Sequence, residues 1–367
     1  MQVLVVNAGS SSLKLSLLDE TDAIVRSENL TLSETGIDTA ELTGILHDWP
    51  RPDAIGHRIV HGGTRFTGPV RIDAEVERAL RELTALAPLH QSKSLAAYDA
   101  VTGQLPDVTA VASFDTAFHA HLPEAAATYA VPESWRERYG VRRYGFHGLS
   151  HGYASRRAAE MLGRPIEALR IVTCHLGAGA SLAAVVGGRS VETTMGFTPL
   201  EGLVMATRSG SIDPGLVLWL EQRADLSADA VSEALERQSG LLALSGTADM
   251  REVEKRADAG DATARLAFDV FVHRLTTGIG AMTAAAGGLD ALAFTGGIGE
   301  HSPRVRLAAA TRLGYLGVRV DSAANDDVEG DADIGSHNAN VRTLVVAARE
   351  DIEIAREARR LLQAPIG

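Results

Sequence analysis

Residues 1–18, MQVLVVNAGSSSLKLSLL, have the pattern of a strand, a turn of small residues and a second strand. Val3 to Val6 form an apolar, mostly β-branched run, and Asn7 to Ser12 have the composition of a turn. Leucines then alternate with Lys14 and Ser16, which is the period of a half-buried strand. The sequence therefore predicts that the chain opens with a hairpin that starts an α/β domain.

The plan of this hairpin recurs later in the chain. Residues 171–186, IVTCHLGAGASLAAVV, again read as apolar strand, small-residue turn and apolar strand. This repetition suggests a duplication that gives two similar α/β domains. Because glycine-containing hairpins are common, chance similarity is the better explanation of this pair taken by itself. A third small-residue turn, Thr295 to Glu300, follows the apolar strand Ala291 to Phe294 and favours the duplication.

Length and composition agree with a globular protein of two domains. The chain has 367 residues, of which 45% are hydrophobic and 22% charged, and it is too long for one compact core. Helical periodicity predicts helices around Val76 to Leu83, from Ser227 as N-cap to a stop at Gly240, from about Ala264 to Ala286, and from about Asp351 to Leu362.

Charge and cysteine content limit the partners and the compartment. A formal net charge of -12 argues against a nucleic acid or an anionic membrane as partner. The single cysteine, Cys174, excludes an internal disulfide and favours a reducing compartment. The chain shows no signal-peptide pattern and no apolar stretch of about 20 residues that could cross a membrane. We expect a cytoplasmic protein.

The small-residue turns have the chemistry of phosphate sites. In Asn7 to Lys14, NAGSSSLK, backbone N–H groups and hydroxyls form a set of donors, and the lysine can return toward the same anion. In Gly296 to Glu300, GGIGE, the absence of side chains lets the backbone approach a ligand closely. Either turn could equally be structural.

Two arginines lie outside the charged helix faces where arginines are usually found. Arg58 is in GHRIVHGG and Arg208 is in MATRSGSIDPG, segments rich in glycine, serine or histidine. A guanidinium in such surroundings needs an anion, which is either a carboxylate of the protein or a phosphate of a ligand. The sequence leaves both alternatives open for each arginine.

One aspartate and two histidines are further candidates. Asp115 directly follows a predicted strand, at the position where open α/β sheets carry reactive groups, although such a residue can also merely cap a turn. His147 and His151 are four residues apart, a spacing that can bind zinc on a helix. The absence of a neighbouring glutamate motif and of a cysteine pair argues against zinc.

Taken together, these segments resemble one family, the acetate kinases within the acetate, propionate and butyrate kinase group. The resemblance runs from residue 1 to the last predicted helix. The similar segments, in the order of the family, are VLVVNAGSSSLK, GHRIVHGG, LAPLH, FDTAFH, RYGFHGLSH, CHLGAG, TTMGFTPLEGLVMATRSGSIDPG and FTGGIGE.

The resemblance implies a fold and an activity. The family groups with actin, sugar kinases and heat-shock ATPases, so we expect two ribonuclease-H-like domains with the nucleotide in a cleft between them. Residues 1–117 with 350–367 would form domain I, and 118–349 a domain II for nucleotide binding and dimerisation. The implied reaction is reversible, magnesium-dependent transfer of a phosphoryl group from ATP to acetate in a homodimer. Manganese could replace magnesium.

The resemblance also implies roles for individual residues. Asn7 and Glu350 would hold the metal, and Asp115, His147 and Arg208 would be catalytic. Arg58 would bind the substrate carboxylate, beside an apolar wall for its methyl group made of Val60, Leu89, Phe146 and Pro199. The implied nucleotide contacts are Lys14, His175, Leu176, Gly177, Ala178, Gly179, Asp249, Met250, Arg251, Gly297, Ile298, Gly299, Glu300 and His301.

Four features depart from the pattern of the family. Ala178, His301 and Arg349 each stand where asparagine is usual, and the chain is shorter than is typical, mainly before Gly56. The rival within the family is a propionate or butyrate kinase with a larger acyl pocket. The rival from another class is a nucleotide-binding switch without catalysis, which would not need both Arg58 and Arg208.

Overall fold

The computed structural model describes residues 1–9, 12–31, 37–86 and 88–364, without the side chains of 85–90. Its chain divides into two compact units, each built around its own mixed sheet. Unit 1 comprises Met1–Ala120, Phe146–Tyr153 and Arg349–Gly367, and unit 2 comprises His121–Gly145 and Ala154–Ala348. Of the helices in the described part of the chain, none is both long and apolar enough to cross a membrane.

The sheet of unit 1 has the strand order β3-β2-β1-β4-β6-β5. The opening hairpin is confirmed, because β1 and β2 pair antiparallel, and β1, β4 and β6 run parallel. The strands are β1 (Val3–Ala8), β2 (Ser12–Leu18), β3 (Ile24–Thr31), β4 (Ala54–Ile59), β5 (Val70–Arg71) and β6 (Thr109–Phe114).

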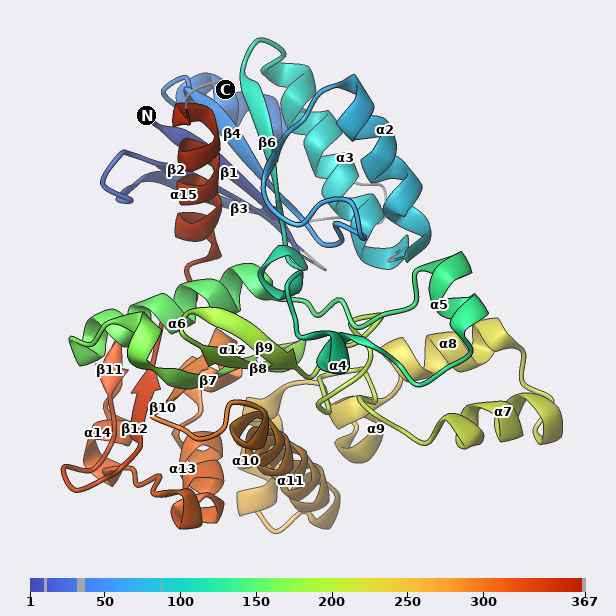
Figure 1. The fold of residues 1–367 in the computed structure, drawn as a ribbon, viewed down its shortest axis with the longest axis vertical. Coiled ribbons are helices and arrows are strands. Elements are labelled where there is room, and N and C mark those ends of the chain that lie inside the picture. The colour runs from blue at the N-terminus through green and yellow to red at the C-terminus, as the bar shows by residue number, and fades with distance from the viewer. Residues whose placement is uncertain (10–11, 32–36, 87, 365–367) are drawn as a thin grey trace. The chain divides into compact units, whose positions relative to one another are not determined.

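Helices cover both faces of this sheet (Figure 1). On one face α3 packs on β1 and β4, and on the other α15 packs on β1, β4 and β6. Gly56 lets α15 approach, because a Cβ at this position would collide with the Ile354 side chain. The helices of this unit are α1 (Thr39–Asp48), α2 (Ala74–Glu82), α3 (Pro88–Gln104), α15 (Glu350–Gln363) and the 3-10 turns Leu83–Leu86 and Ala117–His119.

The sheet of unit 2 repeats the topology of the first, with the order β11-β12-β10-β7-β8-β9. Here too an antiparallel hairpin, β7–β8, continues antiparallel into β9, and β7, β10 and β12 run parallel. A two-residue antiparallel strand closes the same edge in both sheets. The strands are β7 (Arg170–Leu176), β8 (Ala180–Val186), β9 (Arg189–Thr193), β10 (Ala291–Thr295), β11 (Ala332–Asp333) and β12 (Arg342–Val345).

This shared strand order supports the duplication over chance similarity of two hairpins. Unit 2 differs by a larger set of helices around its sheet. They are α4 (Glu124–Ala127), α5 (Glu133–Tyr139), α7 (Pro214–Arg223), α8 (Ala228–Arg237), α9 (Gly240–Ser245), α10 (Met250–Asp258), α11 (Ala262–Ala285), α12 (Gly296–His301), α13 (Pro303–Arg312), α14 (Ser322–Asp326) and the 3-10 turns Ile166–Ala168 and Gly314–Leu316, while α6 (Gly148–Leu162) begins in unit 1.

The helix predictions hold, with two local differences. Ser227 caps α8 as predicted, but the helix ends at Arg237, because the chain turns at Gln238 and Gly240 starts α9 with φ 64°. The predicted glycine-rich turn after β10 is itself a short helix, α12, which follows Thr295 directly. Glycine-rich sequence predicted a turn there because intrinsic helix propensity is low, and packing on β7 overrides it.

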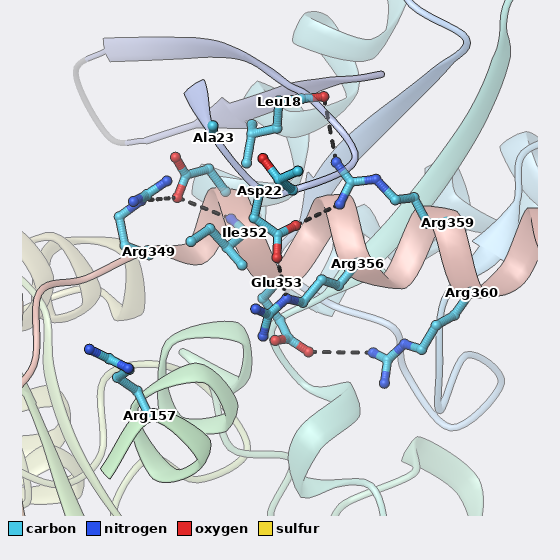
Figure 2. Close-up of polar contacts among 12 residues, drawn as sticks. Leu18, Asp22, Ala23, Arg157, Arg349, Ile352, Glu353, Arg356, Arg359 and Arg360 are labelled. Carbon is cyan, nitrogen blue, oxygen red and sulfur yellow. Dashed lines mark hydrogen bonds and ion pairs between the residues drawn. The ribbon is translucent and has the colours of Figure 1, made fainter. Parts of the chain in front are cut away.

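The C-terminal helix is attached to the first hairpin by a cluster of arginines around Asp22. Asp22 lies in the β2–β3 turn with φ 67°, and its carboxylate accepts hydrogen bonds from Arg356 Nε at 2.7 Å and Arg359 Nη1 at 2.6 Å. Figure 2 shows the carboxylate between the two guanidinium groups. Arg359 also donates to the carbonyl oxygen of Met1 at 3.1 Å. Arg359 of the C-terminal helix is thus bonded both to the β2–β3 turn and to the first residue of the chain.

This attachment predicts a stability effect for Asp22→Asn. Asparagine tolerates the left-handed backbone, so the substitution removes the negative charge and one of the two acceptor oxygens without adding strain. We expect the free energy of unfolding to fall by about 2 kcal/mol, measured by urea denaturation. The control is Asp107→Asn, which breaks an exposed 3.9 Å pair with Arg51 and should cost less than about 0.5 kcal/mol. Equal effects of the two substitutions would contradict the prediction.

Candidate active site

The predicted metal and substrate residues of unit 1 meet at one edge of its sheet. Asn7, Arg58 and Asp115 lie at or just beyond the carboxyl ends of the parallel strands β1, β4 and β6. Glu350 is the first residue of α15, which crosses the same face of these strands. The sequence predicted the strands before Asn7 and Asp115 but not the strand that carries Arg58, and the parallel pairing brings the three side chains together.

Arg58 is the centre of this cluster. Its Nε and Nη2 donate to the Asp115 carboxylate at 3.1 and 2.7 Å, which is the forked geometry of a strong ion pair. Its Nη1 donates to Asn7 Oδ1 at 3.1 Å and lies 3.9 Å from a Glu350 carboxylate oxygen. Asn7 Nδ2 in turn donates to Glu350 at 2.8 Å. Two strand ends, one loop and one helix terminus are thus joined in a polar network.

Burial makes the electrostatics of this network strong. The exposed fractions of the Arg58 and Asp115 side chains are 14% and 2%. Burial by itself would lower the pKa of Arg58, but Asp115 and Glu350 outweigh it and hold this pKa above its ordinary value. Burial raises the pKa of Asp115, and the charge and hydrogen bonds of Arg58 oppose that rise. We conclude that Arg58 and Asp115 form a buried ion pair.

Lys14 lies next to this network. Lys14 in β2 is directly opposite Asn7 in β1, so the two side chains project from the same face of the hairpin. The Lys14 side chain is exposed. Ser10 and Ser11, in the middle of the predicted phosphate turn, lie outside the described residues.

His147 has a strained backbone that is fixed against Asp115. Its φ of 56° is uncommon for a residue other than glycine and costs energy that the surroundings must supply. The next residue, Gly148, donates its N–H to the Asp115 carbonyl oxygen at 2.8 Å, and a Cβ there would collide with that oxygen. The position of the His147 backbone is therefore fixed by the backbone of Asp115.

Two of the four predicted acyl-wall residues are buried in unit 1. Val60 and Phe146 are 6% and 1% exposed, and the Phe146 ring contacts the edge of His61 at 5.5 Å. The Phe146 carbonyl oxygen accepts a hydrogen bond from His119 Nε2 at 3.1 Å. Pro199 belongs to unit 2. The side chain of Leu89 lies outside the described residues.

Unit 2 places two of its predicted nucleotide segments at one edge of its sheet. The turn from His175 to Gly179 joins β7 to β8, and α12 follows β10, which is the parallel neighbour of β7. Gly296, with φ 76°, allows α12 to approach the backbone of Leu176. Gly297 faces open space. Ala178, at the position of the expected asparagine, is exposed and its carbonyl oxygen accepts from Ala206.

The third nucleotide segment has a structural role of its own. Asp249 caps the N-terminus of α10 by accepting from Arg251 N at 2.9 Å, and it also pairs with the Arg251 side chain at 2.7 Å. The Met250 side chain is buried in unit 2 at 3% exposure. Capping and packing account for these three residues without a ligand.

Arg208 differs from Arg58 in its partners. Its Nη1 donates to the Pro199 carbonyl oxygen at 2.6 Å, and among the described residues no carboxylate lies within ion-pair distance of it. Burial lowers the pKa of Arg208, and Glu236 opposes this only in part. Of the two alternatives left open by the sequence, the ion pair within the protein therefore applies to Arg58, while Arg208 remains available to an anion of a ligand.

Sequence reasoning missed one buried arginine and one half-buried group of side chains that brace these segments. Arg306, 1% exposed, donates to the carbonyl oxygens of Gly299 and Glu300 at 3.0 and 2.7 Å and so fixes the end of α12. Tyr129, Arg143 and Glu201 form a second group around the loop that carries Pro199. An arginine three residues after a proline and an isolated tyrosine carry no local signal, because their contacts form only in the folded chain.

The fold and the two clusters define a phosphotransferase built from two related α/β units. The family model described as the acetokinase family matches residues 37–356, so the chain belongs to this family. The expected resemblance and the two-domain α/β fold are thereby confirmed.

Relatives and solved structures agree with this membership. The acetate kinase of Deinococcus deserti is 46% identical over 406 residues, which cover 100% of this chain and 99% of the relative. The acetate kinase structure from Porphyromonas gingivalis has a TM-score of 0.89 and 36% identity over 98% of this chain and 99% of that one. The propionate kinase structure from Francisella tularensis has a TM-score of 0.90 and 35% identity over 97% and 98%.

His57, the residue before Arg58, should make the stability of the fold sensitive to acid. His57 is fully buried against Tyr98, with ring centroids 5.2 Å apart, and burial lowers its pKa to about 3 from 6.5. Between these values the unfolded chain binds a proton that the folded chain does not, so stability is lost as pH falls below about 6.5. His57→Phe should remove up to about 1.4 kcal/mol per pH unit from that slope, measured by urea denaturation between pH 4.5 and 6.

The control for this variant is Tyr98→Phe, which keeps the same ring pair and removes no group that titrates in this range. We expect it to leave the slope as it is. An unchanged slope in His57→Phe would show that His57 is not the group that binds the proton on unfolding.

Proposed function

We propose that this protein transfers the γ-phosphoryl group of ATP directly to the carboxylate of acetate, reversibly, giving acetyl phosphate and ADP. Membership of the acetokinase family supports this reaction. The observation that carries the assignment of the site is the buried network of Asn7, Arg58, Asp115 and Glu350 at the carboxyl ends of three parallel strands. A nucleotide switch without an acceptor does not need a buried arginine held in this way.

The reaction needs alignment and charge stabilisation more than acid–base chemistry. A carboxylate has no proton to lose near neutral pH, so a general base would have no function. The enzyme must bring two anions together and stabilise charge on the transferred group. We propose that Asp115 orients Arg58 toward the acetate carboxylate, and that His147 and Arg208 stabilise the transferring phosphoryl group.

The oxygen atoms of Asn7 and Glu350 fit a magnesium ion. Magnesium is usually held by one or two carboxylates together with water and substrate phosphates, and an amide with one carboxylate is such a set. When bound, the metal would neutralise charge on the phosphates, and manganese has the same ligand preference. Asn7 Nδ2 donates to Glu350, and Asn7 Oδ1 accepts from Arg58, so both would-be ligands belong to the same network.

We propose that the nucleotide is bound mainly by unit 2. Lys14 would contact its phosphates from unit 1, because it is exposed beside Asn7. The adenosine would contact Asp249 to Arg251 and Gly297 to His301, and the phosphates would face the turn from His175 to Gly179. The open space around Gly297 suits a flat ring. We retain domain boundaries at 117–118 and 349–350, with Phe146–Tyr153 packed in unit 1.

One assay tests the reaction. ATP, magnesium and acetate are incubated with the protein, and the acyl phosphate is trapped with hydroxylamine as the hydroxamate. We expect ATP-dependent hydroxamate formation that requires the metal. ATP hydrolysis without hydroxamate would support the rival, a nucleotide switch, and greater turnover with propionate or butyrate than with acetate would support the rival within the family.

Single substitutions test the residues that stabilise the transition state. Arg58→Ala, His147→Ala and Arg208→Ala should each lower kcat by about 10²-fold or more, because Arg58 would align the acetate carboxylate, and His147 and Arg208 would act on the transferred group. The control is Arg78→Ala, an exposed arginine of α2, which should leave kcat within about two-fold. Folding of each variant is checked by circular dichroism. Near-normal kcat in all three would overturn the assignment.

The apolar wall predicts chain-length selectivity. Val60 and Phe146 are buried, so close packing keeps their side chains from moving aside for a longer acid. We expect kcat/KM to decrease from acetate to propionate and more strongly to butyrate, because overpacking costs about 1–3 kcal/mol. Val60→Ala should narrow this range by improving the longer acids, since each buried methylene contributes about 0.8 kcal/mol.

The control for Val60→Ala is Val111→Ala, a truncation of an equally buried valine in the middle of β6. It should lower stability and keep the ranking of acids. If Val60→Ala also keeps the ranking, Val60 does not line the acyl pocket.

We propose a cytoplasmic homodimer in which a second copy covers α7. Most large exposed apolar side chains of the described residues lie on α5 and between Ile212 and Leu226, and α7 has no buried residue at all. Leu218 and Trp219 are 55% and 57% exposed. Exposed apolar side chains concentrated in this way on one helix favour an interface. The buried free thiol of Cys174 fits a reducing compartment.

Sedimentation velocity tests the dimer. Leu218→Glu should weaken dimerisation by at least about 100-fold in Kd, because it places a charge inside an apolar interface. The control is Tyr315→Glu, which is 76% exposed but lies outside this patch, and should leave the dimer intact. A monomeric wild-type protein at micromolar concentration would overturn the proposal.

A further inference from the structure

Three side chains of unit 2 form a compact polar group, here called the Tyr129 hub: Tyr129, Arg143 and Glu201. The Tyr129 hydroxyl donates to one Glu201 carboxylate oxygen, and Arg143 Nη2 donates to the other at 2.9 Å. The Arg143 guanidinium also lies over the Tyr129 ring, 5.5 Å from its centroid. Burial, then the hydrogen bond to Glu201, raises the pKa of the Tyr129 hydroxyl, so it remains a donor at neutral pH.

The hub holds an irregular loop by its backbone. Arg143 Nη1 donates to the carbonyl oxygens of Thr194 and Met195 at 3.3 and 3.1 Å, and the Phe197 N–H donates to the Tyr129 hydroxyl at 3.0 Å. The loop has no helix or strand after β9 ends at Thr193. These side-chain contacts therefore replace the backbone ladder that would hold a regular element.

Gly196 shows how closely the hub packs on this loop. A Cβ at Gly196 would fall on the Glu201 carboxylate and the Tyr129 hydroxyl, and both contacts are with the atoms that form the central hydrogen bond. The Gly196 carbonyl oxygen meanwhile accepts from the N–H groups of Tyr144 and Gly145 at 3.1 and 3.2 Å. The loop can occupy this place only because residue 196 has no side chain.

The loop held by the hub carries two proposed site residues. Pro199 lies two positions before Glu201, and its carbonyl oxygen accepts from Arg208 Nη1 at 2.6 Å. Among the described residues, this is the only hydrogen bond that the Arg208 side chain makes. The direction of the Arg208 guanidinium thus depends on where the hub puts Pro199.

We infer that Tyr129, Arg143 and Glu201 are positioning residues, which set the place of Pro199 and, through its carbonyl, of Arg208. The inference rests on the proposed roles of Pro199 and Arg208. These three side chains would not themselves touch the substrate. A guanidinium that must meet charge as it develops loses much of its effect when displaced by about 1 Å. Loosening of the hub should therefore lower kcat more than it changes substrate binding.

Tyr129→Phe tests the inference with the smallest change, since it removes one hydroxyl and keeps the ring under Arg143. We expect kcat with acetate to fall by about 10-fold or more and KM for ATP to stay within about two-fold. The preference for acetate over propionate should fall several-fold, because Pro199 is no longer fixed. Gly196→Ala should reproduce these effects, since its Cβ occupies the place of the same hydrogen bond.

Tyr144→Phe is the matched control. It removes the hydroxyl of a neighbouring tyrosine, which donates to the Gly140 carbonyl oxygen at 2.8 Å, and keeps the Tyr144 backbone contact with Gly196. We expect its kcat and its acetate preference to match the wild type. A lower melting temperature in Tyr129→Phe with unchanged kcat and acetate preference would show a merely structural role and overturn the inference.

A double-mutant cycle separates this inference from the proposed function. If the hub acts through Arg208, Tyr129→Phe should lower kcat little further in an Arg208→Ala background. Full additivity of the two effects would overturn the inference. If Arg208→Ala itself keeps near-normal kcat, the proposed role of Arg208 fails. If Arg208→Ala is strongly impaired while Tyr129→Phe is normal, only the role of the hub fails.

Discussion

The buried ion pair between Arg58 and Asp115 is the constraint on which the rest of unit 1 depends. A guanidinium at 14% exposure needs partners that replace water, and Asp115 supplies a carboxylate in forked geometry from the end of the next parallel strand. That pairing requires β4 and β6 to end at the same edge of the sheet. Asn7 and Glu350 then complete the network, so the first strand and the last helix are fixed by the same charge. The backbone of His147 follows through Gly148, which is bonded to Asp115.

The strand ends of unit 2 carry different residues from those of unit 1. Its sheet has the topology of the first, but the residues at its strand ends are glycines and an alanine, which present backbone groups. Charged side chains are used behind these segments as braces. Arg306 holds the end of α12, and Arg143 with Glu201 holds the loop of Pro199. A duplicated scaffold therefore carries a polar side-chain cluster in one unit and backbone-lined turns in the other.

Arg58 and Arg208 have similar local sequence patterns but bind different partners in the structure. Both lie in segments of glycine and small polar residues, and both become buried. Arg58 finds a carboxylate in the protein, which keeps it charged and oriented. Arg208 finds a carbonyl oxygen, and burial lowers its pKa. The second arrangement is the one that a bound anion would stabilise, because the guanidinium has not yet been neutralised.

The sequence by itself determined the two hairpins, the strand before Asp115, the helices α2, α8, α11 and α15 and the family, because these depend on local periodicity, turn chemistry and motifs. It also named Asn7, Arg58, Asp115 and Glu350 through resemblance. The tertiary structure decided which of them touch, since strand order and parallel pairing are non-local. It also decided that Arg58 is ion-paired and Arg208 is not, and that GGIGE is a helix. The Tyr129 hub had no sequence signal, because its three members are separated along the chain and become a group only when folding buries their polar atoms together.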